Sequence, residues 1–376
     1  MLLEPTSDQE FFRENTAKFL SDQVPPGEIR RLRDDPDGFD ADYWRRGAEL
    51  GWTSLLVDEA HGGGSLSGQG LIDLTLVAYE FGRHAAPGPL LSTNVVASAL
   101  SRAGGEEHGT VLDAVLAGTS TASWCFQERL AGLTAGALEI RVEGDELVLS
   151  GEKRPVEHAA QAAHLLVTGR SGDGATQVLV PAGTPGLTIR PMHTVDLARR
   201  FSIVRLDAVR VPLDAVVGTP GQAAEQVEHQ VQTALVILCA ETVGTMQRAF
   251  DMTVEWAFDR YSFGRPLASY QELKHRFADM KSWLEAGHAV ADAAALAVES
   301  RAPEANELVS VAKAFVGQYG GELIQDCVQI HGGIGVTFDH DLHLFLRRAT
   351  LDRALMGTPA EHRQRIAADL APQEDR

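Results

Sequence analysis

The sequence has few cysteines, no long apolar run and no excess of basic residues, and each of these absences excludes a class of protein. No stretch of the chain approaches the roughly 20 consecutive apolar residues that a membrane-spanning helix needs. The opening MLLEPTSDQEFF turns polar and acidic within a few residues, without the basic start of a signal peptide or the arginine-rich face of a transit peptide. We therefore expect a cytoplasmic protein with no membrane partner.

Cysteine usage and net charge exclude two further classes. Cys125, Cys239 and Cys327 are far apart and show neither CxxC nor cysteine–histidine ligand spacing, so we expect buried thiols, with no disulfide framework and no metal site. The formal net charge of -19 at pH 7 would repel phosphates over most of the surface. A nucleic-acid partner is therefore not expected, and any anionic ligand must be held by a local cluster of basic groups.

Three blocks of hydrophobic periodicity follow one another along the chain. From Ser7 to about Ala117 the period is helical, and Ser7 with Glu10 gives a capping-box signature at its start. Between about 120 and 218 apolar and polar residues alternate, as in ELVLS, QVLVP and FSIVRLDAVRVP. Helical patterns then return. Nothing in this order resembles the strand–helix alternation or the Gly-x-Gly-x-x-Gly turn of a Rossmann domain.

The blocks predict an α+β protein of three domains. With 376 residues, 44% hydrophobic and 23% charged, the chain has the length and composition of a globular enzyme. We predict an N-terminal α-helical domain at 1–118, a middle antiparallel β domain at 119–218 and a C-terminal helical bundle of four-helix type at 219–376. The main helices expected in the bundle span 224 to 260, 268 to 300 and 304 to 330.

Two stretches of the bundle are unusually specific, RYSFGRPLASYQELKHRFADM (260 to 280) and QIHGGIGVTFDHDLHLFLRRA (329 to 349). They combine an arginine and two glutamines with glycine-rich backbone. Such a set suits a pyrophosphate and a ribose, because arginine forms charge-assisted hydrogen bonds and glycine lets a ligand approach the main chain. Taken alone, Arg260 and Gln271 would more often be solvated surface residues.

Together with the α, β, α order, these stretches resemble the acyl-CoA dehydrogenase family, whose fold we therefore expect. The family pattern R-x-x-F-G, followed by a glutamine, and its pattern Q-x-x-G-G-x-G both occur here. The resemblance implies FAD as cofactor and an oligomer in which these residues reach the ADP half of the neighbouring subunit's flavin. The cofactor-binding residues that it implies are Arg260, Ser262, Phe263, Gln271, Gln329, Gly332, Gly333 and Thr358.

The catalytic base of the family is missing. The implied reaction is α,β-dehydrogenation of an acyl-CoA thioester, in which a carboxylate takes the alpha proton. In most members this carboxylate is a glutamate before Gly-Thr, where this sequence has Met356, and a thioether is no proton base. Other members carry it on the first C-terminal helix, where this sequence has Ala234 followed by Leu235. Glu241, about two turns beyond Ala234, is a weak candidate for a substitute.

The flavin-ring side of the site is altered as well. Where the family has a Thr-Glu-Pro strand motif, this chain has Gln127 and Glu128 after WCF, and where the family has a Trp, Ile/Val, Thr run, it has Pro155-Val156-Glu157. We therefore expect a ring pocket that is rebuilt or lost, although the residues directed at a partner's flavin are retained.

Three hypotheses fit this pattern of loss and retention. In the first, the chain is the base-lacking subunit of a heteromeric acyl-CoA dehydrogenase, in a heterotetramer with a paralogous subunit. In the second, it is a homo-oligomeric flavoenzyme with a different base, or with oxidase or monooxygenase chemistry. In the third, it is a flavin-free scaffold that keeps only the fold. The family's normal electron acceptor, an electron-transferring flavoprotein, is a further candidate partner.

Overall fold

The computed structural model describes residues 4–103, 106–129, 132–134, 136–172 and 174–370. The order of its elements is helical, then β, then helical, and the predicted α+β fold is confirmed. The links between the three parts are residues 117–121 and 213–223, and the proposed domain borders fall inside them.

The N-terminal domain consists of short and medium helices. They are α1 (Ser7–Gln23), α2 (Pro26–Arg31), α3 (Ala41–Glu49), α4 (Gly70–His84), α5 (Leu90–Ala103) and α6 (Glu106–Leu116). The capping box of α1 lies one residue earlier than predicted, since Thr6 is the N-cap and Gln9 completes the box. The pattern Ser/Thr-x-x-Glu/Gln fits both registers, and the extended backbone of Thr6 selects the earlier one.

The middle domain is one mixed β sheet. Its strands are β1 (Ala122–Cys125), β2 (Glu139–Glu143), β3 (Glu146–Glu157), β4 (His164–Ser171), β5 (Gly174–Pro181), β6 (Leu187–Met192) and β7 (Phe201–Pro212). The strand order is β1-β4-β2-β3-β7-β6, and β5 pairs with β4. Most pairs are antiparallel as predicted, but β1 lies parallel to β4, and β2 touches β4 in parallel at Glu139. The chain between β1 and β4, which includes β2 and β3, supplies the long connection that parallel neighbours need.

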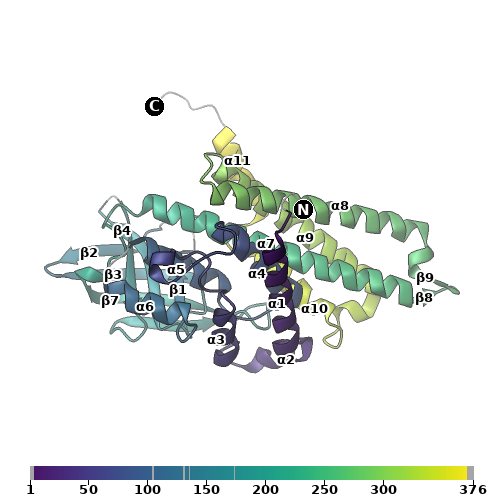
Figure 1. Ribbon diagram of the computed structural model, residues 1–376, viewed down its shortest axis with the longest axis horizontal. Helices are drawn as coiled ribbons and strands as arrows, with labels where there is room; N and C mark the ends of the chain where they lie inside the picture. The colour runs from purple at the N-terminus through teal and green to yellow at the C-terminus, as the bar shows by residue number, and fades with distance from the viewer. Residues whose placement is uncertain (1–3, 104–105, 130–131, 135, 173, 371–376) are drawn as a thin grey trace.

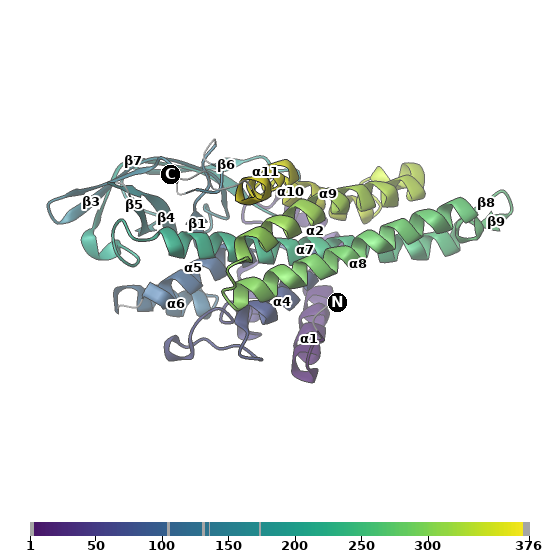
Figure 2. The same ribbon diagram turned by 90° about the horizontal axis from the view of Figure 1, so that it is seen from above.

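The C-terminal domain is built around one long helix. Its elements are α7 (Ala224–Asp259), β8 (Tyr261–Ser262), β9 (Arg265–Pro266), α8 (Gln271–Glu299), α9 (Ala305–His331), α10 (Leu342–Ala354) and α11 (Pro359–Leu370). At 1.5 Å per residue, the 36 residues of α7 span about 54 Å. Figures 1 and 2 show α7 running from the β sheet to the β8–β9 hairpin at the opposite end of the molecule.

Two glycines allow α4 of the N-terminal domain to pack closely against α7. A Cβ on Gly82 of α4 would lie 1.9 Å from the carbonyl oxygen of Glu241, and a Cβ on Gly244 of α7 would lie 2.0 Å from the carbonyl oxygen of Tyr79. The two helices therefore meet backbone to backbone. Their side chains belong to one apolar core that includes residues of both helical domains, whereas the β domain has a second core of its own.

Three further findings concern the residues that the structure describes. No helix among these residues is long and apolar enough to cross a membrane. The three cysteines are buried and unpaired. The described residues hold no group of three or more His, Cys, Asp or Glu side chains arranged to bind a metal ion.

Candidate functional site

The residues predicted to bind the cofactor lie in two separate places. All except Thr358 lie where α7 ends, α8 begins and α9 ends, at one end of the C-terminal bundle (Figure 1). We call this region the bundle tip; it consists of Arg260, Ser262, Phe263, Gln271, Gln329, Gly332 and Gly333. Thr358 lies in the loop between α10 and α11.

Two side chains of the bundle tip, those of Phe263 and Arg260, are not covered by the rest of the described chain. Phe263 is 96% exposed, at a backbone φ of +50°. Arg260 is the C-cap residue of α7, and its guanidinium carbon lies 5.8 Å from the centroid of the Trp256 ring. Among the described residues, the guanidinium of Arg260 takes part in no ion pair and no side-chain hydrogen bond. Trp256 in turn stacks on His331, with ring centroids 5.1 Å apart.

The glycines and apolar residues around the tip leave room for a covering partner. Gly332 has φ +67° and ψ -147°, a conformation that is essentially restricted to glycine. A Cβ on Gly332 or Gly333 would meet nothing within 4 Å. Further exposed apolar side chains of this end are Phe258, Tyr261, Ile334, Val336 and Phe338. Clustered exposed apolar residues are typical of a binding or subunit interface.

The loop between α10 and α11 places Met356 inside the protein. Met356 is buried at a left-handed φ of +54°, and its carbonyl oxygen accepts a hydrogen bond of 2.8 Å from Nε2 of His362. Thr358 caps α11: its N–H and its hydroxyl both donate to Glu361, at 2.7 and 2.8 Å. The polar groups of Thr358 are thus engaged within its own helix start, and its contact with a flavin stays a prediction.

Arg348 is a buried arginine whose guanidinium group donates hydrogen bonds to several oxygen acceptors. The guanidinium of Arg348 donates to Oδ2 of Asp196 at 2.7 Å and to Oε1 of Glu241 at 2.6 Å. It also donates to the carbonyl oxygens of Ala85 and Ala86, at 3.0 Å each. Arg348 thereby ties α10 to the end of α4, to α7 and to the loop before β7.

A second buried arginine extends this network toward the β domain. Arg199 donates to both carboxylate oxygens of Glu241 at 3.0 Å and forms an ion pair with Glu157. The other oxygen of Glu157 accepts from the backbone N–H of Ser92 at 3.3 Å. Glu241, the weak candidate for a substitute base, is therefore bound by two guanidinium groups and is not available as a proton acceptor.

Two buried carboxyl groups of this region, Asp196 and Asp352, have pKa values shifted in opposite directions. Burial opposes ionisation of Asp196, but the charge and hydrogen bond of Arg348 and the N–H donors of Ala198 and Arg199 outweigh it, so its pKa is lowered. Burial and the neighbouring charge of Glu241 raise the pKa of Asp352 well above its usual value, although Arg199 and Arg348 oppose this. We call the residues Glu157, Asp196, Arg199, Glu241 and Arg348 the buried ion network.

Two cavities flank this network. The one against Met356 has a volume of about 40 Å³ and is lined by residues that include Leu91, Phe126, Glu157 and Arg199. This is close to the volume of about 30 Å³ that one water molecule occupies in the liquid. The second cavity is an open cleft of about 740 Å³ between the β domain and α11, which shares Gln127 and Pro155 with the first.

The other predicted base position is closed as well. Ala234 and Leu235 are fully buried in the middle of the helical core. The sequence reading did not find the buried ion network, although one signal for it was present. The family has Arg-Asp in its last helix where this chain has Arg347-Arg348, and the exchange of a carboxylate for a guanidinium reverses a charge that the surroundings must compensate.

Comparison with known proteins places the chain in a family. Residues 6–118 match the family model described as acyl-CoA dehydrogenase, N-terminal domain, and residues 226–371 match the model described as acyl-CoA dehydrogenase, C-terminal domain. Among curated proteins, the chain is 28% identical to the acyl-CoA dehydrogenase IpdE2 of Mycolicibacterium smegmatis, over 97% of this chain and 99% of that protein. It is also 28% identical to the probable acyl-CoA dehydrogenase YngJ of Bacillus subtilis, over 98% and 100%.

Solved structures agree with these matches. A variant of the Tcur3481-Tcur3483 steroid ACAD superposes with a TM-score of 0.87 at 28% identity, covering 96% of this chain and 97% of that one. The ChsE4-ChsE5 complex from Mycobacterium tuberculosis has the same fold, with a TM-score of 0.90 at 24% identity and 99% of each chain covered. The chain therefore belongs to the acyl-CoA dehydrogenase family, a family of FAD-dependent oxidoreductases.

Proposed function

We propose that this chain is the base-lacking subunit of a heteromeric acyl-CoA dehydrogenase. In this proposal the bundle tip holds the ADP half of a flavin whose ring and catalytic base belong to a paralogous partner subunit. The acyl-CoA thioester is oxidised in the partner's site. An electron-transferring flavoprotein, the normal acceptor of the family, would then take the electrons.

The observation that carries the proposal is the filled space around Met356. A cavity of about 40 Å³ accommodates about one water molecule and not an acyl thioester. The space that remains is bordered by Arg199 and Glu157, whose ion pair is buried on both sides. Opening this cavity would leave buried charges without their partners, which is strongly destabilising.

The proton chemistry of the family also lacks a group in this chain. Met356 and Ala234 cannot accept a proton, and both oxygens of Glu241 receive hydrogen bonds from Arg199, one of them also from Arg348. A general base must lie within hydrogen-bond reach of the proton that it removes. These residues therefore support a subunit that does not itself remove the alpha proton.

The two ends of an FAD molecule would fit this chain differently. At the ring side, Pro155 has no N–H to donate, and the carboxylate of Glu157 is bound by Arg199 and by the N–H of Ser92. These groups do not fit an isoalloxazine ring that needs hydrogen-bond donors. At the bundle tip, the exposed guanidinium of Arg260 and the open backbone at Gly332 and Gly333 fit a pyrophosphate and its sugar.

Co-purification tests the proposal. The isolated chain should purify without flavin, whereas the chain expressed with a paralog that carries glutamate before Gly-Thr should form a yellow complex with one FAD per heterodimer. Flavin absorbance against protein concentration, with the oligomeric state from light scattering, measures both. A full equivalent of FAD on the isolated chain would refute the half-site assignment.

One observation favours a second candidate, a complete homo-oligomeric flavoenzyme. The cleft of about 740 Å³ beside Met356 is large enough for a cofactor, and Arg129, Arg154 and Arg365 lie around it. A ligand with a phosphate group could be held there. The same co-purification separates the two candidates, because this one predicts a yellow protein without any partner.

A further inference from the structure

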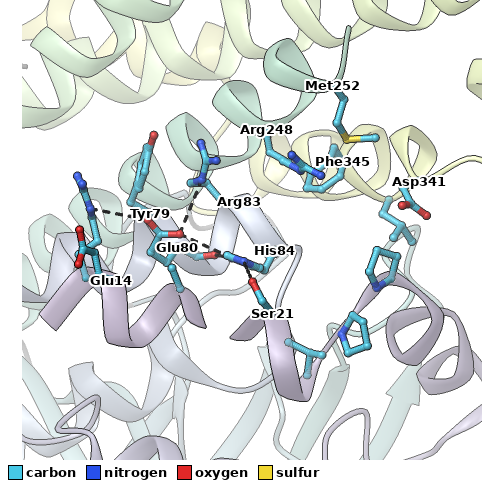
Figure 3. A pocket seen from close by; sticks show the side chains of 16 residues that line it. Glu14, Ser21, Tyr79, Glu80, Arg83, His84, Arg248, Met252, Asp341 and Phe345 are labelled. Carbon is cyan, nitrogen blue, oxygen red and sulfur yellow. Dashed lines mark hydrogen bonds and ion pairs between the residues drawn. The ribbon is translucent and has the colours of Figure 1, made fainter. Parts of the chain in front are cut away.

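A separate cavity of about 580 Å³ lies between α1, α4, α7 and the start of α10 (Figure 3). None of the residues lining it belongs to the buried ion network or to the bundle tip. Its volume is in the usual range of small-molecule sites, about 300–1,000 Å³. Nothing in the proposed half-site uses it.

One side of this cavity is cationic and includes an arginine without a counter-charge. Arg83 is neutralised by Asp251 at 3.1 Å, and the nearest carboxylate contact of Arg13 is the 3.9 Å approach to Glu80. Arg248, from α7, has no ion pair or hydrogen bond to any side chain in the described part of the sequence. A guanidinium that faces a cavity without a partner is a ready site for an anionic group.

Glu80 lies at the floor of the cavity and is incompletely paired. Its side chain is nine-tenths or more buried, its Oε2 atom accepts no hydrogen bond, and its cationic neighbours Arg83 and Arg13 stay 3.8 and 3.9 Å away. Burial raises its pKa to about 7, although Arg83 and Arg13 oppose this. Near neutral pH the protonated form of Glu80 is therefore far more populated than that of an ordinary glutamic acid.

His84 does not compete for an anion. Its Nδ1–H donates to the carbonyl oxygen of Glu80 at 2.8 Å, and the hydroxyl of Ser21 donates to its Nε2 at 3.0 Å, as Figure 3 shows. Burial lowers its pKa, and Arg83 and Arg248 add to this. His84 is thus a neutral ring in a fixed orientation, and Arg248 remains the uncompensated charge.

The cavity also has apolar lining residues, which are Val24, Pro25, Met252, Leu344 and Phe345, and Figure 3 shows Met252 and Phe345 beside Arg248. A ligand that satisfies both kinds of lining needs one anionic group and an apolar body. We propose that this cavity binds a small amphipathic carboxylate, with its charged end against Arg248 and Arg13 and its apolar end against Met252 and Phe345.

Binding of such an anion is linked to a proton. The groups that face Glu80 are Arg13 and Glu14 on α1, Tyr79, Arg83 and His84 on α4, Arg248 and Asp251 on α7, and Asp341 before α10. A bound carboxylate disfavours the ionised form of Glu80 and raises its pKa further, so binding takes up a proton. The affinity therefore falls as the pH rises through about 7, where free Glu80 titrates, and on to the higher pKa that Glu80 has in the complex.

The first test uses octanoate as the probe and isothermal titration calorimetry on the full-length chain. Octanoate should bind with one site, and octanol and acetate, which each lack one of the two features, should bind much more weakly. Arg248→Gln should weaken octanoate binding by roughly ten- to a hundredfold, the effect of losing one charge-assisted hydrogen bond. Arg363→Gln, the same change on the exposed face of α11, should leave it unaltered.

The second test concerns the linked proton. Glu80→Gln mimics the protonated acid, so it should keep octanoate binding at high pH and abolish the fall across pH 7. Glu14→Gln removes the same charge from the rim of the cavity and should retain that fall. Absence of octanoate binding, an unaltered affinity in Arg248→Gln, or a persistent pH dependence in Glu80→Gln would each overturn the proposal. All of these measurements are made without flavin, so they are independent of the half-site.

Discussion

At the scale of single residues, Met356 is the position at which the proposed lack of a catalytic base can be tested. A glutamate there would restore the residue type that the family uses, but the variant carboxylate would lie beside Glu157 in a cavity of about 40 Å³. The buried ion network already sets three carboxyl groups against two guanidinium groups. One more carboxylate there has no unused cation to pair with.

We therefore expect Met356→Glu to destabilise the isolated chain by about 1–3 kcal/mol at pH 7, without conferring dehydrogenation. Burial raises the pKa of such a carboxyl in the folded state. The pH-dependent part of the destabilisation should therefore be absent below the unfolded value of about 4.3 and should grow as the pH rises through the folded pKa.

Met356→Gln is the matched control, since it has the same size and must adopt the same φ of +54°. It should show a loss that does not vary with pH. Thermal melts at several pH values, with anaerobic bleaching and enoyl-CoA formation on a panel of acyl-CoA thioesters, make the comparison. Clear turnover by the glutamate variant alone would mean that the ring pocket is competent and would favour the complete flavoenzyme.

At the scale of elements, the contact between α4 and α7 determines where the residues of the buried ion network lie relative to one another. Glu241 belongs to α7, and Arg348 reaches the carbonyl oxygens at the end of α4. Both helices can approach so closely only because Gly82 and Gly244 have no Cβ. A side chain at either position has to separate the helices, and the acceptors of Arg348 would move apart.

Gly244→Ala should therefore destabilise the protein by more than about 2 kcal/mol, since its Cβ would lie 2.0 Å from a carbonyl oxygen of Tyr79. The control is Gly287→Ala in α8, whose Cβ would meet only the side chains of Met246 and Val243 at ordinary distances of 3.7 Å. That change should stabilise by about 0.5–1 kcal/mol, because alanine has the higher helix propensity. Chemical denaturation of the two variants measures the difference, and equal effects would contradict the backbone contact.

At the scale of the whole molecule, the family residues retained at the bundle tip lie in a different part of the protein from the small cavity against Met356. The C-terminal half of α7 separates Glu241 of the buried ion network from the bundle tip (Figure 2). The two parts can therefore contribute to different subunits' sites. In the proposed function, this separation lets the bundle tip contact a partner's flavin while the space around Met356 is filled.

Arg260→Ala should lower the FAD content of the complex with the partner, because it removes a charge-assisted contact worth about 1.5–3 kcal/mol. Arg265→Ala, in the same hairpin, is the matched control, since its guanidinium lies 3.8 Å from the centroid of its own chain's Tyr270 ring. Equilibrium dialysis of FAD against each complex checks this. Equal FAD affinity of the two variants would make Arg260 an ordinary surface charge.

The sequence predicted the fold and the long helices well, because hydrophobic periodicity records which side of an element is buried. Helix α7 begins at the predicted residue and ends one residue early. The parallel pairing of β1 with β4 was missed, since a short strand carries no signal for its neighbour's direction. The buried ion network was missed for a related reason: Glu157, Asp196, Arg199, Glu241 and Arg348 are scattered in sequence, and only the folded chain brings them together.

Helix α7 carries Glu241 near its middle and ends just before Arg260, without a break between them. Each residue added to or removed from that stretch would turn one end against the other by about 100° and shift it by about 1.5 Å. A single deletion would thus point Arg260 away from its present direction even if every contact of Glu241 survived. The helix fixes angular phase as well as distance, so a change in the length of this stretch is not tolerated even at positions where the residue type can be exchanged.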